Sequence, residues 1–354
     1  MLDPDKRPTP EEVCVPGALR AALPAAWLVA GLLTGCGGIT GHVATSPVGP
    51  VGPAQAPPDG MTPAGVVVPL GAPATAVVID PSTRMVALAL IDPPRVRLVP
   101  LDGAGAPREV PLPGPAAGLA LAAPGGPVLV PIGAPGALIR VPLDGGAPSR
   151  RDLPGAARDA VMVDGFTVVA LGERIVVLQG DQVRFTIAGF VDATNVVCVG
   201  RSPAPTVGVL DQGRAAVNVV NVSSGTISAA LRAGNGAARA VADRFGRMLV
   251  TDVRHGELLA FAGDPPVLRQ RFPLPGAPYA LAYDDRRDLA WVTLTARNEV
   301  VGLAVAAGEP VVVHRFPTVR QPDAVAVDPA SGRVVVVSAS GGGLQLIDPE
   351  RVVH

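Results

Sequence analysis

Cysteine, histidine and aromatic residues are scarce in this chain, and each shortage excludes a class of protein. The 354 residues include three Cys and four His, and aromatic residues make up 3% of the total. Cys14, Cys36 and Cys198 are far apart in the sequence, which argues against a disulfide-rich scaffold and against a Cys/His metal site. The formal net charge of −1 gives no electrostatic reason to expect nucleic acid as a partner.

A long apolar run is also missing, because the best candidate for a membrane span, residues 21–33, is too short. Thirteen helical residues reach about 20 Å, whereas the hydrocarbon core of a bilayer is about 30 Å thick. Arg20 precedes the run, as expected for a signal sequence. We therefore predict that residues 1–35 are a signal peptide.

The end of this segment carries a second signal. The sequence Leu33-Thr34-Gly35-Cys36 resembles the bacterial lipobox. This resemblance implies that Cys36 is diacylated, with palmitate-type chains, and becomes the mature N-terminus. We therefore expect a lipoprotein that a lipid anchor holds at the extracytoplasmic face of the cell membrane. Residues 37–63 contain six prolines among Gly, Ala and Ser and show no hydrophobic period, so we predict a tether over residues 36–63.

The rest of the chain repeats one short pattern, an apolar run of strand length that often ends in Asp. A repeat near 40 residues with strand-like content is typical of the four-stranded blades of a β-propeller. In the sixth copy, strands are predicted over 279–283, 289–295, 300–305 and 311–316, with turns between them. The seven copies begin 36 to 44 residues apart, at Thr75, Gly118, Asp159, Asn195, Ala238, Tyr279 and Asp323.

The two ends of the repeat region complement each other. The seventh copy supplies strands over 323–327, 333–338 and 343–347 but no fourth strand, and the apolar segment 66–70 precedes the first copy. Closing the ring removes open sheet edges, so residues 66–70 are expected to pair with 343–347. The predicted fold class is all-β, a seven-bladed β-propeller over residues 64–354 whose last blade is closed by the N-terminal strand of the domain.

With these repeats, the chain resembles the seven-bladed propellers of the YncE/NHL/YVTN-like group. The YVTN signature is echoed in Ala290-Trp291-Val292-Thr293, and the Trp-Asp dipeptides of WD40 blades are missing. The lipobox-like segment adds a similarity to actinobacterial propeller lipoproteins of the LppL type. The resemblance implies a binding role in the periplasm or cell envelope, and it does not fix a ligand.

Candidate ligand-binding residues follow from the expectation that propellers bind ligands at one mouth of the central channel and on the loops around it. Polar side chains begin four of the predicted inner strands: Asp159, Asn195, Tyr279 and Asp323. Loops of the last blades add Arg254, His255, Arg297, Asn298, Arg320 and Gln321. We predict a polar, partly basic patch beside the channel mouth, with ordinary solvated loop charge as the alternative interpretation.

The sequence contains no nucleophile elbow, phosphate-binding loop or dinucleotide-binding motif. No cofactor and no resident metal are expected. The first hypothesis is therefore a non-catalytic, envelope-anchored lipoprotein that presents its propeller to an unidentified protein or small molecule. The alternative is a propeller hydrolase or lactonase that uses Asp159, Asn195 and Asp323 as a carboxylate or Ca²⁺ site.

Overall fold

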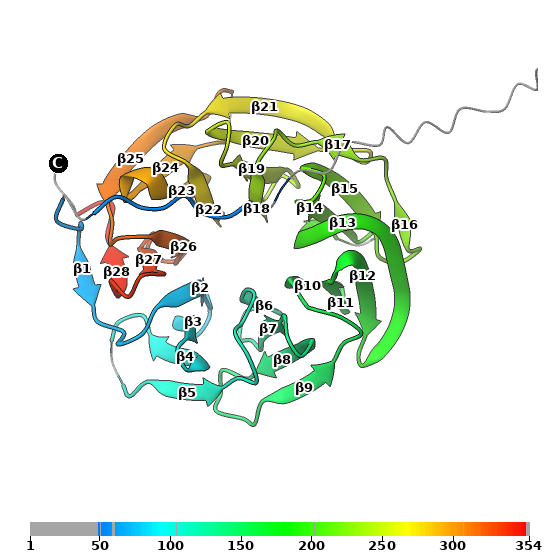
Figure 1. The fold of residues 1–354 in the computed structure, drawn as a ribbon, viewed down its shortest axis with the longest axis horizontal. Coiled ribbons are helices and arrows are strands. Elements are labelled where there is room, and N and C mark those ends of the chain that lie inside the picture. The colour runs from blue at the N-terminus through cyan, green and yellow to red at the C-terminus, as the bar shows by residue number, and fades with distance from the viewer. Residues whose placement is uncertain are drawn as a thin grey trace, which may run out of the picture. The chain divides into compact units, whose positions relative to one another are not determined.

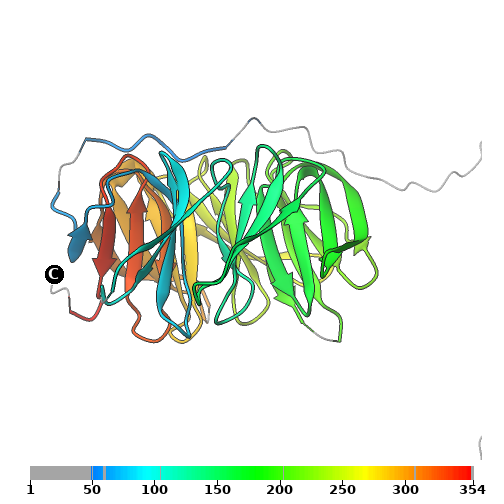
Figure 2. The ribbon, with the colours of Figure 1, turned by 90° about the horizontal axis from the view of Figure 1, so that it is seen from below.

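The protein is an all-β propeller whose sheets stand around a central channel (Figures 1 and 2). A computed structural model describes residues 49, 51–58, 61–103, 105–201, 203–306 and 308–351. The predicted signal peptide and Cys36 lie outside the described residues. Within the described part, five sheets have four strands each and one sheet has eight.

In each four-stranded sheet the strands are antiparallel and run from an inner strand beside the channel to an outer strand (Figure 1). The first sheet contains β2 Ala74–Ile79, β3 Met85–Ile91, β4 Pro94–Pro100 and β5 Arg108–Pro111, and the second contains β6 Ala120–Leu121, β7 Val128–Ile132, β8 Ala137–Val141 and β9 Ser149–Asp152. Later in the chain come β18 Ala237–Ala242, β19 Met248–Asp252, β20 Glu257–Ala262 and β21 Val267–Pro273, then β22 Pro278–Asp284, β23 Leu289–Leu294, β24 Glu299–Ala304 and β25 Val311–Pro317.

The last four-stranded sheet joins the two ends of the domain, because β1 Val66–Val68 lies beside β28 Leu344–Ile347, followed by β27 Val334–Ser338 and β26 Pro322–Val327. Helical structure in the described residues is one 3-10 turn, η1 Thr295–Arg297. None of the described residues forms a helix of the length and apolarity needed to span a membrane.

The eight-stranded sheet owes its size to one long strand, β13 Gln182–Gly200. The first half of β13 pairs with β12, where Ile187 lies opposite Ile175, and the second half pairs with β14, where Val196 lies opposite Val209. The other strands of this sheet are β10 Asp159–Val163, β11 Phe166–Ala170, β12 Gly172–Gln179, β14 Thr206–Asp211, β15 Ala216–Asn221, β16 Thr226–Ile227 and β17 Leu231–Arg232.

The strands predicted for the sixth and seventh copies are confirmed within one or two residues by β22–β25 and β26–β28. Their second strands are fully buried, as in the Val-rich β27, because each sheet is covered on both faces by its neighbours. Such continuous apolar runs of β-branched residues are typical of strands buried on both faces.

The Asp that ends many of the repeated runs builds the turn to the next strand. Asp80, Asp243, Asp284 and Asp328 are all buried, with at most 6% of each residue exposed. Each carboxylate accepts hydrogen bonds from backbone N–H groups two to four residues further along the chain. Such bonds from an Asp side chain stabilise tight turns. The repeated Asp is therefore a structural residue of the turn, in agreement with the interpretation of 284–288 as a turn.

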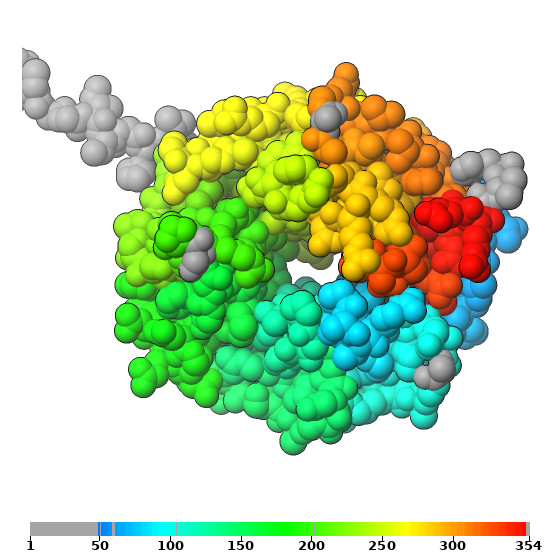
Figure 3. All heavy atoms as spheres, turned by 180° about the vertical axis from the view of Figure 1, so that it is seen from behind, coloured from blue at the N-terminus to red at the C-terminus, as the bar shows by residue number. Residues whose placement is uncertain are grey.

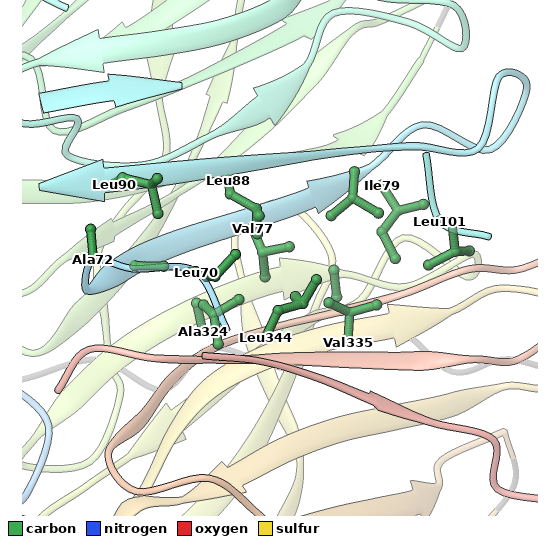
Figure 4. Close-up of a cluster of buried hydrophobic side chains, with 14 residues drawn as sticks. Leu70, Ala72, Val77, Ile79, Leu88, Leu90, Leu101, Ala324, Val335 and Leu344 are labelled. Atoms are coloured by element: carbon green, nitrogen blue, oxygen red, sulfur yellow. The ribbon is translucent and has the colours of Figure 1, made fainter. Parts of the chain in front are cut away.

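The expected closure of the ring is present. Val66 pairs with Leu346 and Val68 with Leu344 in an antiparallel register. The sheet that β1 completes packs against the first sheet through a shared apolar cluster, in which Leu88 and Val77 face Val335 and Leu344 (Figure 4). An ion pair of 3.1 Å between Arg84 and Asp328 links the same two sheets. Residues more than 200 positions apart thus hold the ends of the domain together.

Candidate functional site

The channel contains a cavity of about 380 Å³, and its wall is built by the inner strands of the sheets. These are β2, β10, β13, β18, β22 and β26, with the segment leading into β6. A central hollow is also visible from the opposite side of the ring (Figure 3). Two carboxylates line the cavity, Asp159 and Asp323, and both belong to the residues predicted from the sequence.

Asp159 lies at the start of β10 and is held by three donors. Its carboxylate accepts hydrogen bonds from Nδ2 of Asn195 at 3.3 Å, from the backbone N–H of Val196 at 3.0 Å and from that of Ala160 at 2.9 Å. Burial raises the pKa of Asp159, and the hydrogen bonds and the charge of Arg239 offset this effect only in part. The ionised carboxylate therefore lacks part of the stabilisation that water would give it.

Asp323 lies in β26 and has a similar environment with fewer donors. It accepts a hydrogen bond of 2.8 Å from Nε2 of Gln321. Burial raises its pKa to about 6, against the lowering effects of Gln321 and Arg239. Asp323 is consequently ionised at neutral pH and becomes protonated under mildly acidic conditions.

Arg239, in β18, is one of two arginines in the cavity wall, and the sequence prediction missed it; the other, Arg158, lies 3.6 Å from Asp192 in an ion pair. The Cζ atom of Arg239 lies 4.9 Å from the ring centroid of Tyr279, in a cation–π contact. Its charge acts on both Asp159 and Asp323. Tyr279 itself is buried and packs in the core between sheets, so it supports Arg239 rather than lining the cavity.

Irregular pairing at the start of several inner strands accounts for the direction of side chains such as Arg239 and Asp323, whereas β10, with Asp159, pairs regularly. The register shifts between Ala237 and Arg239 in β18 and between Pro322 and Ala324 in β26, which leaves Ala238 and Asp323 as extra residues. Comparable shifts occur in β2, β13 and β22. Such bulges re-aim side chains at functional sites. Here they occur where the polar residues of the cavity lie.

The cavity wall also contains buried polar atoms without a partner. Among the described residues these include Oδ1 of Asn195 and Oγ1 of Thr75. A buried acceptor without a hydrogen bond is unfavourable by about 1–3 kcal/mol. Together with the two carboxylates, these atoms make the cavity rich in acceptors and ready for a molecule that supplies donors.

The predicted loop residues have a different role, because three of them hold residues from the N-terminal end of the domain. We call residues 51–58 the strap. Gln321 accepts from the N–H of Ala56 and donates to the carbonyl of Ala54, both at 2.9 Å, and Asn298 donates to the carbonyl of Pro57 at 3.0 Å. The strap crosses the loops of the later sheets on one face of the ring (Figures 1 and 2).

The strap lies within the predicted tether, and in the structure it lies against the ring. Ala56 is only 3% exposed, and Val51 packs against the core cluster between the later sheets. Just before the strap, Arg254 donates to the carbonyl of Gly49 at 3.0 Å. The prediction was based on the missing hydrophobic period, whereas the contacts use the backbone of this segment.

His255 belongs to a third arrangement. Its Nδ1 lies 3.1 Å from Asp252, and these two residues and Glu257 are the one group of His, Cys or acidic side chains among the described residues that is close enough to share an ion. Glu257 is already paired with Arg271, and Asp252 accepts three backbone N–H groups. The group is thus accounted for by internal contacts.

The structure therefore divides the ten predicted ligand-binding residues. Asp159, Asn195 and Asp323 meet around the cavity, and Tyr279 supports its wall. Arg254, Asn298 and Gln321 contact the N-terminal segment, and His255 caps a turn beside Asp252. Arg297, at the end of η1, and Arg320, in the segment before β26, are both exposed. A ligand-binding role for these residues stays a prediction.

Comparison with solved structures supports the fold. A chain of hydrazine synthase from Kuenenia stuttgartiensis is similar with a TM-score of 0.66 and 12% identity, over 82% of this chain and 99% of that chain. Inactive virginiamycin B lyase from Staphylococcus aureus with quinupristin is similar with a TM-score of 0.66 and 14% identity, over 79% of this chain and 97% of that chain. The WD40 propeller domain of Doa1 is similar with a TM-score of 0.66 and 12% identity, over 80% of this chain and 96% of that chain.

At these identities the likeness concerns the fold alone. Neither known protein families nor curated proteins give a match to this chain.

Proposed function

We propose that this protein is a non-catalytic binding protein whose channel cavity takes a small polar molecule bearing an amine. The observation that carries the proposal is the pair of incompletely compensated carboxylates, Asp159 and Asp323, around a cavity of about 380 Å³. A cationic amine supplies both positive charge and hydrogen-bond donors, which are what these groups lack.

The remaining polar groups narrow the ligand class further. The free acceptor of Asn195 takes one more donor from the ligand, and the guanidinium of Arg239 suits an acceptor or anionic group at the ligand's other end. A zwitterionic compound such as an amino acid, or an amine with hydroxyl groups such as an amino sugar, combines these features.

A thermal-shift experiment with the full chain tests the proposal. Probes are amino acids, amino sugars and the neutral sugars matched to them. Because a ligand that binds only the folded state raises Tm, at least one amine probe is expected to raise it, and the effect should be lost in the Asp159→Asn/Asp323→Asn double variant. Asp152→Asn, at an exposed position, is the matched control. Failure of every amine probe, or an undiminished shift in the double variant, would contradict the proposal.

We further propose that the propeller has seven blades. The eight-stranded sheet contains two of the sequence repeats, those beginning at Asp159 and Asn195, and β13 supplies the outer strand of one and the inner strand of the next. On this interpretation the five four-stranded sheets and the two halves of the large sheet give seven blades, in line with membership of the YncE/NHL/YVTN-like group.

The membrane anchor is a separate proposal that rests on the sequence. The apolar run at 21–33 followed by Leu33-Thr34-Gly35-Cys36 supports cleavage before Cys36, lipidation of its thiol and attachment to the extracytoplasmic face of the membrane. Metabolic labelling with a radioactive fatty acid tests this. Label is expected in the unmodified chain and not in Cys36→Ala, and equal label in both would contradict the anchor.

A further inference from the structure

The strap, residues 51–58, is recognised through its backbone. The amide of Gln321 pairs with the carbonyl of Ala54 and the N–H of Ala56, two residues apart, which is how a neighbouring β-strand would bind an extended segment. Asn298 adds a bond to the carbonyl of Pro57. No side-chain group of the strap takes part in these hydrogen bonds, so the face selects an extended backbone.

Val51 is partly buried against the core cluster, but the closest fit to a strap side chain is at a small residue, Ala56. Ala56 is 3% exposed, whereas its neighbours Gln55 and Pro57 are both exposed. Pro53, Pro57 and Pro58 restrict the strap to extended conformations and so reduce the conformational entropy that is lost on docking. The face therefore fits a proline-containing segment with a small residue at its centre.

The residues that hold the strap are kept in an unusual backbone conformation. Asn298 and Gln321 have φ angles of +51° and +54°, which non-glycine residues rarely adopt. Oδ1 of Asn298 accepts the N–H of Gln321 at 3.1 Å, so the two residues support each other. Strained positions of this kind persist where the surrounding structure fixes them, and they are frequent at binding sites.

The strap is not part of the ring that it covers. No strap residue belongs to a strand, and the ring is closed by β1, which follows the strap in the chain and pairs with β28. Gln345, which donates to the carbonyls of Ala64 and Pro317, fixes this junction independently of the strap. The ring that carries the strap is thus closed by strands to which the strap does not belong.

We infer that the face built by Asn298 and Gln321 is a docking site for an extended, proline-containing polypeptide segment, and that the strap occupies it until a partner segment of the same chemistry displaces it. The partner presents an extended backbone, a small residue in the position of Ala56 and prolines beside it. Gln321 joins this site to the channel cavity through its hydrogen bond to Asp323, but the inference does not depend on binding of an amine ligand in the cavity.

Peptide binding by the full chain tests this inference. The probe is a fluorescent peptide with the sequence of residues 49–58, Gly-Pro-Val-Gly-Pro-Ala-Gln-Ala-Pro-Pro. In one variant, residues 51–58 are replaced by an equally long Gly/Ser segment, which leaves the site vacant. This variant is expected to bind the peptide at least tenfold more tightly than the unmodified chain, as measured by fluorescence anisotropy.

Two matched changes locate the site. Gln321→Gly, introduced into the Gly/Ser variant, removes the amide but tolerates the positive φ, and it should weaken peptide binding at least tenfold. A peptide with Arg in place of Ala56 should fail to bind. A second variant, Ala56→Arg in the full chain, vacates the site by a single substitution. Release of its strap is measured by hydrogen exchange, as faster exchange of the backbone amides of residues 51–58.

The inference would be overturned if a folded variant with a vacant site did not bind the peptide. It would also be overturned if Gln321→Gly left peptide binding unchanged. If the Gly/Ser variant does not fold, the Ala56→Arg variant decides the question. If both variants unfold, the strap is a structural part of the domain and the inference is wrong.

Discussion

Nε2 of Gln321 donates a hydrogen bond of 2.8 Å to Oδ1 of Asp323, and this bond connects the channel cavity to the strap. The same amide binds the backbone of Ala54 and Ala56. All its hydrogen-bonding groups are therefore used, on one side by a carboxylate of the cavity and on the other by the N-terminal segment. A change in the charge of Asp323 is expected to act on both.

Replacing Asp323 should remove a specific pH dependence of stability. Its pKa in the folded protein is raised to about 6 from 3.8, so the folded state holds a proton between these values that the unfolded state has lost. Stability therefore falls as pH rises through this window. Asp323→Asn should stabilise the protein at pH 7 by on the order of 1 kcal/mol, a figure reduced for partial exposure to solvent.

Urea denaturation at pH 4.5 and pH 7.5 measures this effect. The difference between the two pH values should shrink in Asp323→Asn and stay unchanged in Asp181→Asn, whose carboxylate is exposed. An equal pH dependence in all three proteins would show that Asp323 titrates as an ordinary surface carboxylate.

Arg239 is expected to control the charge of the cavity. Its positive charge lowers the pKa of Asp323 and Asp159, although burial outweighs it at both. Arg239→Met retains most of the side-chain volume and removes the charge, so the pKa of Asp323 should rise above about 6, by roughly half a unit to one unit. Carboxyl-carbon NMR titration measures the shift, and Arg150→Met is the surface control. A pKa that is unchanged in Arg239→Met would place the guanidinium out of electrostatic reach.

Asp328, one of the Asp residues in the turns, should show the opposite pH dependence to Asp323. Burial acts to raise the pKa of Asp328, but hydrogen bonds from Ser331 and Ala330 and the charge of Arg84 outweigh it, so the pKa lies below 3.8. The stabilisation by Asp328 is therefore complete above about pH 4, and it is lost as pH falls through the lowered pKa that Asp328 has in the folded protein.

Asp328→Ala leaves the backbone N–H groups of this turn without their acceptor and removes the ion pair with Arg84. We expect it to lower the free energy of unfolding at pH 7 by about 1–3 kcal/mol. Asp181→Ala should change it by less than about 0.5 kcal/mol. Equal effects of the two substitutions in chemical denaturation would contradict a structural role for the repeated Asp.

The sequence allowed the strands and the ring closure to be predicted because both leave local signals. Runs of Val and Leu separated by turn residues mark strands such as β23 and β27, and the missing fourth strand of the last copy indicates a partner near residue 66. The extent of the eight-stranded sheet was not predicted, because β13 continues through Gly189, where a turn would be expected.

The site was only partly predictable for a different reason. Asp159 and Asp323 could be found because they begin repeat copies. Arg239 was missed because it lies one position further along its copy, and the bulge at Ala238 that accommodates it leaves no signal in the sequence. The strap was missed because its contacts join residues more than 240 positions apart through backbone atoms, for which residue type carries little information.

Cross-linking of the two ends of the domain is the most direct test of the closed ring on which the cavity and the strap site depend. Val66 and Leu346 lie opposite each other in paired antiparallel strands, within the range of Cα separations that a disulfide requires. In a chain whose three native Cys are replaced by Ser, Val66→Cys/Leu346→Cys should form a disulfide under mild oxidation. The bond would appear as a mobility shift on a non-reducing gel, while Val66→Cys/Leu268→Cys should not form one. Two free thiols in the first protein, or equal cross-linking in both, would contradict the closed ring.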